Sequence, residues 1–166
     1  MKHFRILVPL AAALALAVVA AGTALAAQTA AFTGTFAGKV TEQVDGQSVK
    51  ASATGTGSPV LGNVRLGKST LTGLVAATTA NPPCSPLSGP GTITSKLGKM
   101  KVTLATTSRG CAASEEDQND ITVSGDAKVN GGTLKFKKAK GSLHFSGKYD
   151  RKAGTFLVKL TGRLTY

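Results

Sequence analysis

The sequence has no tryptophan and only eight other aromatic residues, six Phe and two Tyr. Proteins that bind sugars or single-stranded nucleic acid commonly stack their ligands on aromatic side chains, so this scarcity weakens both classes of function. Histidine is also rare, because His144 is the only one after His3. A hydrolase triad needs a histidine base beside its nucleophile, and no Gly-x-Ser-x-Gly elbow is present. A hydrolase is therefore not expected.

Metal ligands are equally sparse. Cys84 and Cys111 are the only cysteines, and two cysteines alone make a poor metal site. The acidic run at residues 115–120 could wrap a hard cation, but its spacing is not that of an EF-hand loop. A solvated acidic loop is the simpler interpretation. The sequence predicts neither a metal nor a cofactor.

Acidic residues number only eight. General acid–base catalysis would require one or two of them in a cavity with a shifted pKa. Asp45 and Asp150 are expected in turns and residues 115–120 in a loop, while the face of Asp126 is not fixed by its surroundings. We assign none of them a catalytic role. The full set is Glu42, Asp45, Glu115, Glu116, Asp117, Asp120, Asp126 and Asp150.

The N-terminal segment has the pattern of a secretory signal peptide. Lys2 and Arg5 precede an uncharged run of Ala, Leu and Val at residues 6–21, and Ala24 and Ala26 give the small-x-small cleavage pattern. The run falls short of the ~20 apolar residues of a membrane span, which favours cleavage over an anchor. We expect residues 1–26 to be removed on export through the Sec route. The secreted protein would then lack a stable membrane anchor.

Residues 27–166 have the usual length of a single domain. Export would place Cys84 and Cys111 in an oxidising compartment, so we predict that they form a disulfide. In the chain-entropy model a disulfide that closes a loop of this size stabilises the fold by roughly 3–4 kcal/mol. The alternative, a reactive thiol pair, would want a Cys-x-x-Cys spacing or a nearby histidine.

A two-residue alternation of apolar and polar side chains runs through this domain, which is typical of β-strands. In residues 32–40, for example, Phe32, Phe36 and Val40 share one face. Helical periodicity is absent, apart from a single turn near Phe136. We expect surface loops at residues 81–90, which are rich in proline, and at residues 108–120. The predicted strands fall within residues 32–40, 49–56, 64–77, 99–106, 121–129, 143–149 and 156–166.

Glycine is frequent inside these strand patterns, where it permits the bends of a curved or closed sheet. Closure would also remove exposed strand edges. The sequence therefore predicts an all-β fold, a small antiparallel β-barrel of about eight strands. A two-sheet β-sandwich is the alternative.

The segment at residues 131–141, GGTLKFKKAKG, resembles the Gly-Gly-Thr-Gly-[Arg/Lys]-Phe-x-x-Ala-x-Gly segment of dirigent proteins and of secreted bacterial relatives with the allene oxide cyclase-type barrel. Leu134 stands where that family usually has glycine. The resemblance implies an eight-stranded barrel with a central cavity, often assembled into trimers. A homo-oligomer is therefore one of the assemblies that the resemblance allows. The residues that carry it are Gly131, Gly132, Thr133, Phe136, Ala139 and Gly141.

The segment also has a plain physical interpretation. Gly131 and Gly132 supply freedom for a turn, and Phe136 with Ala139 can plug one mouth of a barrel while the lysines point outward. A plug explains the pattern without any activity. We therefore expect this protein to share the family's fold, and we do not extend the family's chemistry to it.

Positive charge is concentrated near the C-terminus. Without the leader, 18 basic residues face eight acidic ones, a formal charge of +10, and residues 127–166 hold ten basic residues against Asp150 alone. Such a surface attracts anionic polymers in a salt-dependent way, although lysines also solubilise and protect strand edges. The candidate polyanion-binding residues are Lys135, Lys137, Lys138, Lys140, Lys148, Arg151, Lys152, Lys159 and Arg163.

These observations favour a secreted, non-enzymatic binding protein, whose partner is a small apolar ligand or an anionic cell-surface polymer. Lysine outnumbers arginine and interleaved aromatics are few, which argues against specific nucleic-acid recognition. The alternative is a dirigent-like or cyclase-type barrel that acts on a small apolar intermediate. An interior filled with Phe, Val and Leu would favour binding, whereas ionisable or Tyr side chains converging in an open cavity would favour the alternative.

Overall fold

The structure is a computed structural model that describes residues 27–166 except 47, 79–82 and 115. The predicted leader therefore lies outside the described residues. No helix in the described part is long and apolar enough to cross a membrane. The elements are β1 (Thr29–Asp45), β2 (Ser48–Gly57), β3 (Val60–Leu61), β4 (Val64–Arg65), β5 (Ser69–Thr78), β6 (Cys84–Ser88), β7 (Pro90–Ser95), β8 (Gly98–Leu104), β9 (Arg109–Ala112), β10 (Asp120–Gly132), the 3-10 helix η1 (Leu134–Phe136), β11 (Lys140–Asp150) and β12 (Thr155–Thr165).

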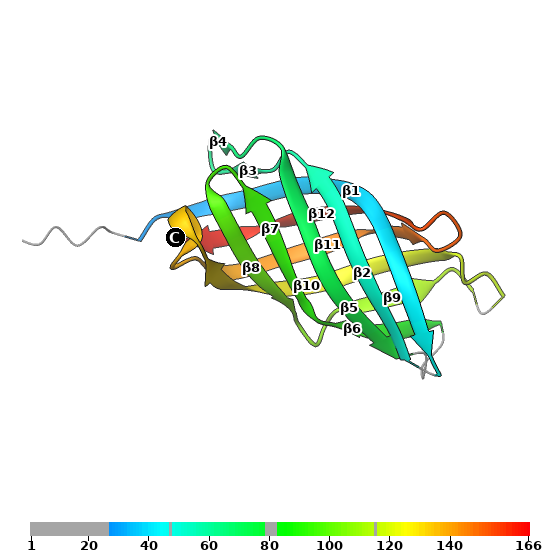
Figure 1. The fold of residues 1–166 in the computed structure, drawn as a ribbon. Coiled ribbons are helices and arrows are strands. Elements are labelled where there is room, and N and C mark those ends of the chain that lie inside the picture. The colour runs from blue at the N-terminus through cyan, green and yellow to red at the C-terminus, as the bar shows by residue number, and fades with distance from the viewer. Residues whose placement is uncertain (1–26, 47, 79–82, 115) are drawn as a thin grey trace, which may run out of the picture.

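Eight strands close into an antiparallel barrel, which confirms the predicted fold class and makes the sandwich alternative wrong (Figure 1). Around the ring the order is β1, β12, β11, β10, β8, β7, β5 and β2, and β2 pairs back onto β1. Successive strands along the chain are mostly neighbours, so the barrel is an up-and-down meander. The short β3–β4 hairpin lies outside the ring and pairs with the beginning of β1. The predicted strand at residues 64–77 is thus divided, because Gly67, with φ 69°, separates β4 from β5.

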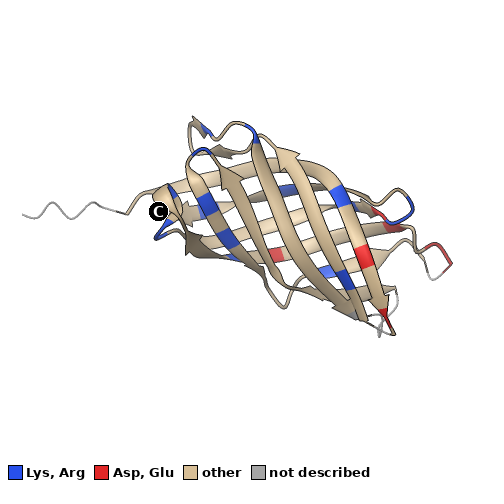
Figure 2. Ribbon diagram, in the orientation of Figure 1, with Lys and Arg blue, Asp and Glu red and all other residues tan. Residues whose placement is uncertain are grey.

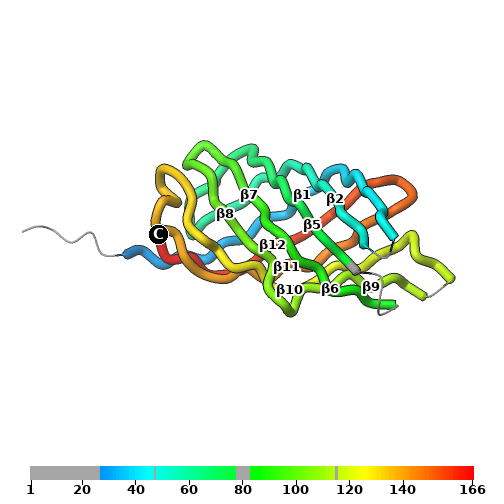
Figure 3. Tube along the Cα trace, turned by 60° about the horizontal axis from the view of Figure 1, so that its bottom comes forward, coloured from blue at the N-terminus to red at the C-terminus, as the bar shows by residue number. Residues whose placement is uncertain are grey.

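One wall of the barrel is built from two pairs of short strands placed end to end. β7 pairs with β8 toward the C-terminal end of the molecule, and β6 pairs with β9 toward the opposite end (Figure 3). We call the end that holds η1 and the C-terminus the closed end. We call the opposite end, which holds β6, β9 and the β11–β12 turn, the open end.

The loop predicted at residues 81–90 begins at positions 81 and 82, which lie outside the described residues, and it is wrong from Cys84 onward, since β6 and the start of β7 occupy those positions. Proline lacks the donor of a strand ladder, but that donor is not needed here. Leu87 N–H donates to Ser108 O, so the nitrogen of Pro86 is directed to the other side of β6, where the β5 pairing has ended. Pro90 begins β7, a position that tolerates proline. The loop predicted at 108–120 is likewise shortened by β9.

Large side chains fill the closed half of the barrel. Their solvent exposure is 1% or less, and they come from β1, β3, β8, β11 and β12, from the β4–β5 connection and from η1. Burial of this apolar surface is the main stabilising term of the fold. The largest of these side chains are Phe32, Phe36, Leu61, Leu66, Met100, Phe136, Leu143 and Leu164.

The segment that resembles the dirigent proteins forms the cap of the closed end. Thr133 N–H donates to Lys99 O at 2.8 Å, and Thr133 Oγ1 accepts from Lys99 N–H at 3.0 Å. Gly132 makes this close approach possible, because a Cβ at that position would lie 1.8 Å from Lys99 O. Gly131 has φ 77°, in the left-handed region that favours glycine. The cap is therefore attached directly to the β7–β8 hairpin.

The remaining residues of the segment complete the cap. Phe136 is 1% exposed and Ala139 is fully buried, so both fill the mouth as the sequence predicts. Gly141, the second residue of β11, lies so close to β12 that a Cβ would be 2.2 Å from Arg163 O. The lysines at 135, 137, 138 and 140 are exposed around the cap. The three glycines, Thr133, Phe136 and Ala139 thus each have a structural role in the cap.

Leu134 has φ 50°, a left-handed conformation that costs a residue with a Cβ roughly 1–2 kcal/mol. Its side chain is 76% exposed, so removing it loses little buried apolar surface. We expect Leu134→Gly to raise the free energy of unfolding by about 0.5–1 kcal/mol, after allowance for the greater freedom of glycine in the unfolded chain. Urea denaturation measures the change. Leu134→Ala is the control, because it removes the same exposed side chain but keeps the strained Cβ; an equal gain there would contradict the explanation.

Candidate functional site

The open half of the barrel is hollow. It contains a cavity of about 300 Å³ that reaches the surface at the open end. This volume lies at the lower limit of pockets that hold small ligands. Apolar side chains from the eight ring strands and from β6 and β9 supply most of the wall, including Val49, Leu71, Ile93, Val102, Phe145 and Phe156.

The hollow follows from the size of the inward-facing residues. In the closed half these positions hold Phe, Leu and Met, whereas in the open half many hold alanine or glycine. β2 shows the change clearly, because its Ala, Ser and Thr composition places only Val49, Ala51 and Ala53 on the cavity wall. The small inward residues of the open half are Ala51, Ala53, Gly73, Ala77, Gly91, Gly110, Ala112 and Ala127.

Three polar side chains, which we call the rim trio, meet at the cavity opening: Glu42, Tyr149 and Arg151. Arg151 Nε lies 3.2 Å from Glu42 Oε2, and the hydroxyl of Tyr149 is hydrogen-bonded to the same carboxylate. The Glu42 side chain is 18% exposed and that of Arg151 35%, so the ion pair is only partly solvated. All three residues line the cavity.

Arg151 is fixed by the loop that follows β9. Its backbone N–H donates to Asn119 O at 2.9 Å, and Nη1 donates to Gln118 O at 3.4 Å. The turn that begins at Arg151 is thereby connected across the opening to a second loop. The position of the guanidinium depends on both loops.

Tyr149 is a hydrogen-bond donor at neutral pH. Burial raises its pKa to about 12, and the hydrogen bond and negative charge of Glu42 act in the same direction. The phenol therefore stays protonated over the physiological range. General acid–base catalysis works best with a pKa near the working pH, so Tyr149 is better suited to holding Glu42 than to transferring protons.

Sequence reasoning did not find the rim trio, although the alternation contained the signal. Glu42 is two residues beyond Val40 on the inward face of β1, and Tyr149 and Arg151 continue the inward phase of Phe145 along β11. Arg151 was predicted to bind polyanions, but it is paired with Glu42. Only closure of the barrel brings these distant positions together.

Asp126 and His144 lie on the outer surface near the middle of the barrel. Asp126 Oδ1 is 3.2 Å from His144 Nδ1, and its other oxygen accepts from Thr107 Oγ1 at 3.1 Å. His144 faces outward, as predicted, with a side chain that is 58% exposed. Within the described residues no three potential metal ligands of the His, Cys, Asp and Glu type gather together.

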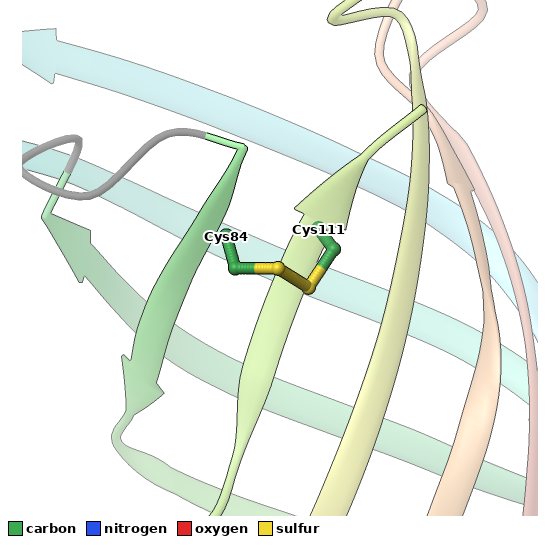
Figure 4. Close-up of a disulfide and its surroundings, with 2 residues drawn as sticks. All are labelled: Cys84 and Cys111. Atoms are coloured by element: carbon green, nitrogen blue, oxygen red, sulfur yellow. A yellow bond between two sulfur atoms is a disulfide. The ribbon is translucent and has the colours of Figure 1, made fainter. Parts of the chain in front are cut away.

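Cys84 and Cys111 form the predicted disulfide (Figure 4). The two residues are directly opposite one another on β6 and β9, in the wall of the open half. They therefore join two strands rather than two loops, which corrects the prediction. A small barrel with a disulfide is consistent with an extracellular protein.

Charge is segregated along the barrel (Figure 2). The described acids Glu42, Asp45, Glu116, Asp117, Asp120 and Asp150 belong to the open end, and Asp126 lies near the middle. The closed half and its turns contain eleven exposed basic residues and no acid among the described ones. We call this set the basic cap: Arg65, Lys68, Lys96, Lys99, Lys101, Lys128, Lys135, Lys137, Lys138, Lys140 and Arg163.

The structure divides the basic residues that the sequence singled out. Lys135, Lys137, Lys138, Lys140 and Arg163 belong to the basic cap, where Lys128 of β10, from the same basic C-terminal region, and the lysines of β8, which the sequence did not point to, join them. The other four are distributed over the open half. These are Lys148, Arg151, Lys152 and Lys159.

Comparison of the chain with known protein families, with curated proteins and with solved structures finds no match. The resemblance of residues 131–141 to the dirigent and allene oxide cyclase-type proteins therefore stays a prediction.

Proposed function

We propose that this protein is exported through its N-terminal leader and binds a small apolar molecule in the open half of the barrel. The cavity is the observation that carries this proposal, because its wall is mostly apolar and it opens to solvent. An apolar molecule that leaves water for such a wall gains roughly 25 cal/mol for each Å² buried. Apart from Arg151 at the rim, the described basic residues lie on the exterior and do not hinder this binding.

Filling the cavity tests the proposal. Ala53 faces the cavity from β2, whereas the next residue toward the open end, Ser52, is exposed on the outside of the same strand. We expect Ala53→Phe to weaken binding of N-phenyl-1-naphthylamine, a neutral dye that fluoresces in apolar surroundings, by at least about tenfold in Kd. The large ring would occupy the space that the dye needs. Fluorescence titration measures the change.

Ser52→Phe is the matched control, since it adds the same ring to the outer surface and should leave the affinity unchanged. Circular dichroism of both variants establishes that the barrel is folded. Equal dye binding by the wild type and folded Ala53→Phe would contradict binding in the cavity.

The rim trio supports the alternative that the barrel acts on a small apolar intermediate, because three ionisable or phenolic groups converge at an open cavity. Binding remains our conclusion, since Tyr149 stays protonated and Glu42 is engaged by two partners. Mass spectrometry of a molecule recovered after incubation separates the two. An unchanged mass and retention time support binding, whereas conversion supports the alternative.

The basic cap favours a second function, contact with an anionic polymer of the cell surface or matrix. Its charges lie at one end without interleaved acids among the described residues, so they add rather than cancel. We expect the combined substitution of Lys99, Lys101, Lys137 and Lys138 by alanine to elute from heparin at a clearly lower salt concentration than the wild type.

A matched variant replaces Lys39, Lys50, Lys148 and Lys152, which are equally exposed in the open half. It loses the same net charge, so a smaller shift in its elution would assign binding to the basic cap. Equal shifts would show that net charge alone determines retention on heparin. Early elution of the wild type itself would contradict the proposed contact with an anionic polymer.

A further inference from the structure

The wall of the cavity contains one weakly paired strand, β6. Its residues Ser85 and Leu87 line the cavity in the open half. Among the described residues, β5 pairs with β6 at only two positions, Ala76 with Ser88 and Ala77 with Leu87. By contrast, β1 pairs with β12 along the whole of β12. In the part of the chain that the structure describes, β5 therefore gives little support to the half of β6 that lies nearer the opening.

That half of β6 is held by its other neighbour, β9. The two strands pair at three positions, and Ala112 N–H donates to Pro83 O at 2.8 Å. β9 itself is held more firmly, because all four of its residues pair with β10 on the opposite side. Local opening begins where backbone pairing and packing are sparse. We therefore expect β6 to detach from this wall before β9 does.

The disulfide fastens β6 to β9 from the outside. Cys84 and Cys111 are directly opposite one another on the two strands (Figure 4). The residues before and after each cysteine line the cavity, so by the alternation of a strand the cysteines themselves belong to the outer face of the wall. Both cysteines are half-buried. A small thiol can thus reach the bond without entering the cavity.

The far end of β6 is anchored independently of the disulfide. Gly89, which follows β6, has φ 135°, a conformation that favours glycine, and a Cβ there would lie 1.9 Å from Leu74 O. Leu104 N–H donates to Gly89 O at 3.0 Å. Opening of the disulfide therefore frees the end of β6 at the cavity opening, while the end at Gly89 stays in place.

We propose that the disulfide between Cys84 and Cys111 is a redox latch of the cavity, so that a dithiol reductant frees β6 and releases the bound apolar molecule. A thiolate of the reductant attacks one sulfur to form a mixed disulfide, which the second thiol of the reductant then resolves. Two electrons and two protons pass to the protein, which keeps two thiols, while the reductant leaves as a disulfide. This inference rests on the proposed function, because it regulates binding in that cavity.

Detachment of β6 lowers the affinity because it removes part of the apolar wall. Leu87 no longer covers the ligand, and water reaches the ligand through the side of the barrel. A ligand that binds only when the wall is closed has an apparent affinity reduced by the fraction of closed molecules. By the same linkage, a bound ligand opposes reduction of the disulfide.

Titration of N-phenyl-1-naphthylamine into the oxidised wild type and into the wild type reduced by dithiothreitol tests the latch. We expect reduction to weaken binding by at least about fivefold in Kd, the lower end of the usual coupling between two sites. The far-ultraviolet circular dichroism should stay that of a β-barrel, and mass spectrometry after alkylation counts the free thiols. In a buffer of reduced and oxidised dithiothreitol, saturating dye should shift the equilibrium toward the disulfide by the same factor.

Two variants separate the latch from a general loss of stability. The double variant Cys84→Ser, Cys111→Ser should bind the dye as weakly as the reduced wild type and should not respond to dithiothreitol. Phe136→Leu destabilises the closed end, outside the cavity, and keeps the disulfide. It should bind the dye with the affinity of the wild type and weaken on reduction as the wild type does.

The outcomes distinguish the two proposals. If the dye does not bind the oxidised wild type, the proposed function fails and the latch fails with it. If the dye binds the oxidised and the fully reduced protein equally, only the latch fails. Loss of the β-sheet signal on reduction, or equal weakening in oxidised Phe136→Leu, would also overturn the latch, because release would then follow general unfolding of the barrel.

Discussion

Replacement of Phe136 by alanine is expected to lower the free energy of unfolding by about 3–5 kcal/mol, the usual cost of deleting a buried phenylalanine. The ring is 1% exposed and packs into the core cluster at the closed end. Its neighbours cannot collapse into the space easily, because η1 is held to the β7–β8 hairpin by backbone hydrogen bonds from Thr133 and Lys135. Urea denaturation followed by far-ultraviolet circular dichroism measures the loss.

Leu134→Ala provides the comparison, since Leu134 is two residues earlier, on the exposed side of the same short helix. Its effect should stay within about 0.5 kcal/mol. If Phe136→Ala is too unstable to purify, Phe136→Leu should show a smaller loss in the same direction. A loss below about 1 kcal/mol for Phe136→Ala would mean that the cap does not contribute to the core.

Removal of the disulfide is expected to cost about 3–4 kcal/mol of unfolding free energy in the chain-entropy model. The cysteines are separated by 27 positions along the chain, so the crosslink restricts a long loop of the unfolded protein. It also joins β6 and β9, which are short and pair over only three residues of each strand. The double variant Cys84→Ser, Cys111→Ser, compared with the wild type in urea, measures this cost.

Reduction supplies an independent check. The wild type in the presence of a reductant should unfold at the same urea concentration as the double serine variant, whereas the variant itself should not respond to the reductant. A double variant as stable as the oxidised wild type would show that strand pairing alone holds this part of the wall.

The alternation of side chains predicted the barrel because it reports directly on which face of a strand is buried. Phe32 and Phe36 on β1, and Met100 and Val102 on β8, are buried as the pattern indicates. The prediction of a loop around Pro86 was wrong, because proline destabilises a strand only where the ladder needs its backbone N–H as a donor. Which side of a strand is paired is not visible in the sequence. The β3–β4 hairpin was missed because its strands are two residues long.

The site was harder to predict than the fold. Glu42, Tyr149 and Arg151 each had an inward phase, but their meeting depends on closure, which brings β1 beside the β11–β12 turn. A central cavity was implied only by the resemblance of residues 131–141, and its place in the open half of the barrel was not predicted. The position of the cavity depends on which strands contribute small residues at the same level of the barrel. The sequence predicted β2, with Ala51 and Ala53, only as a weak strand.

The segregation of charge gives the molecule an electric dipole along its long axis (Figure 2). Near a negatively charged wall, such a body experiences a torque that turns its positive pole toward the wall. The entrance between Glu42 and Arg151 is then presented to the surrounding medium. Because ionic screening limits this field to about 8 Å at physiological salt, the orientation is selected only in the last step of approach.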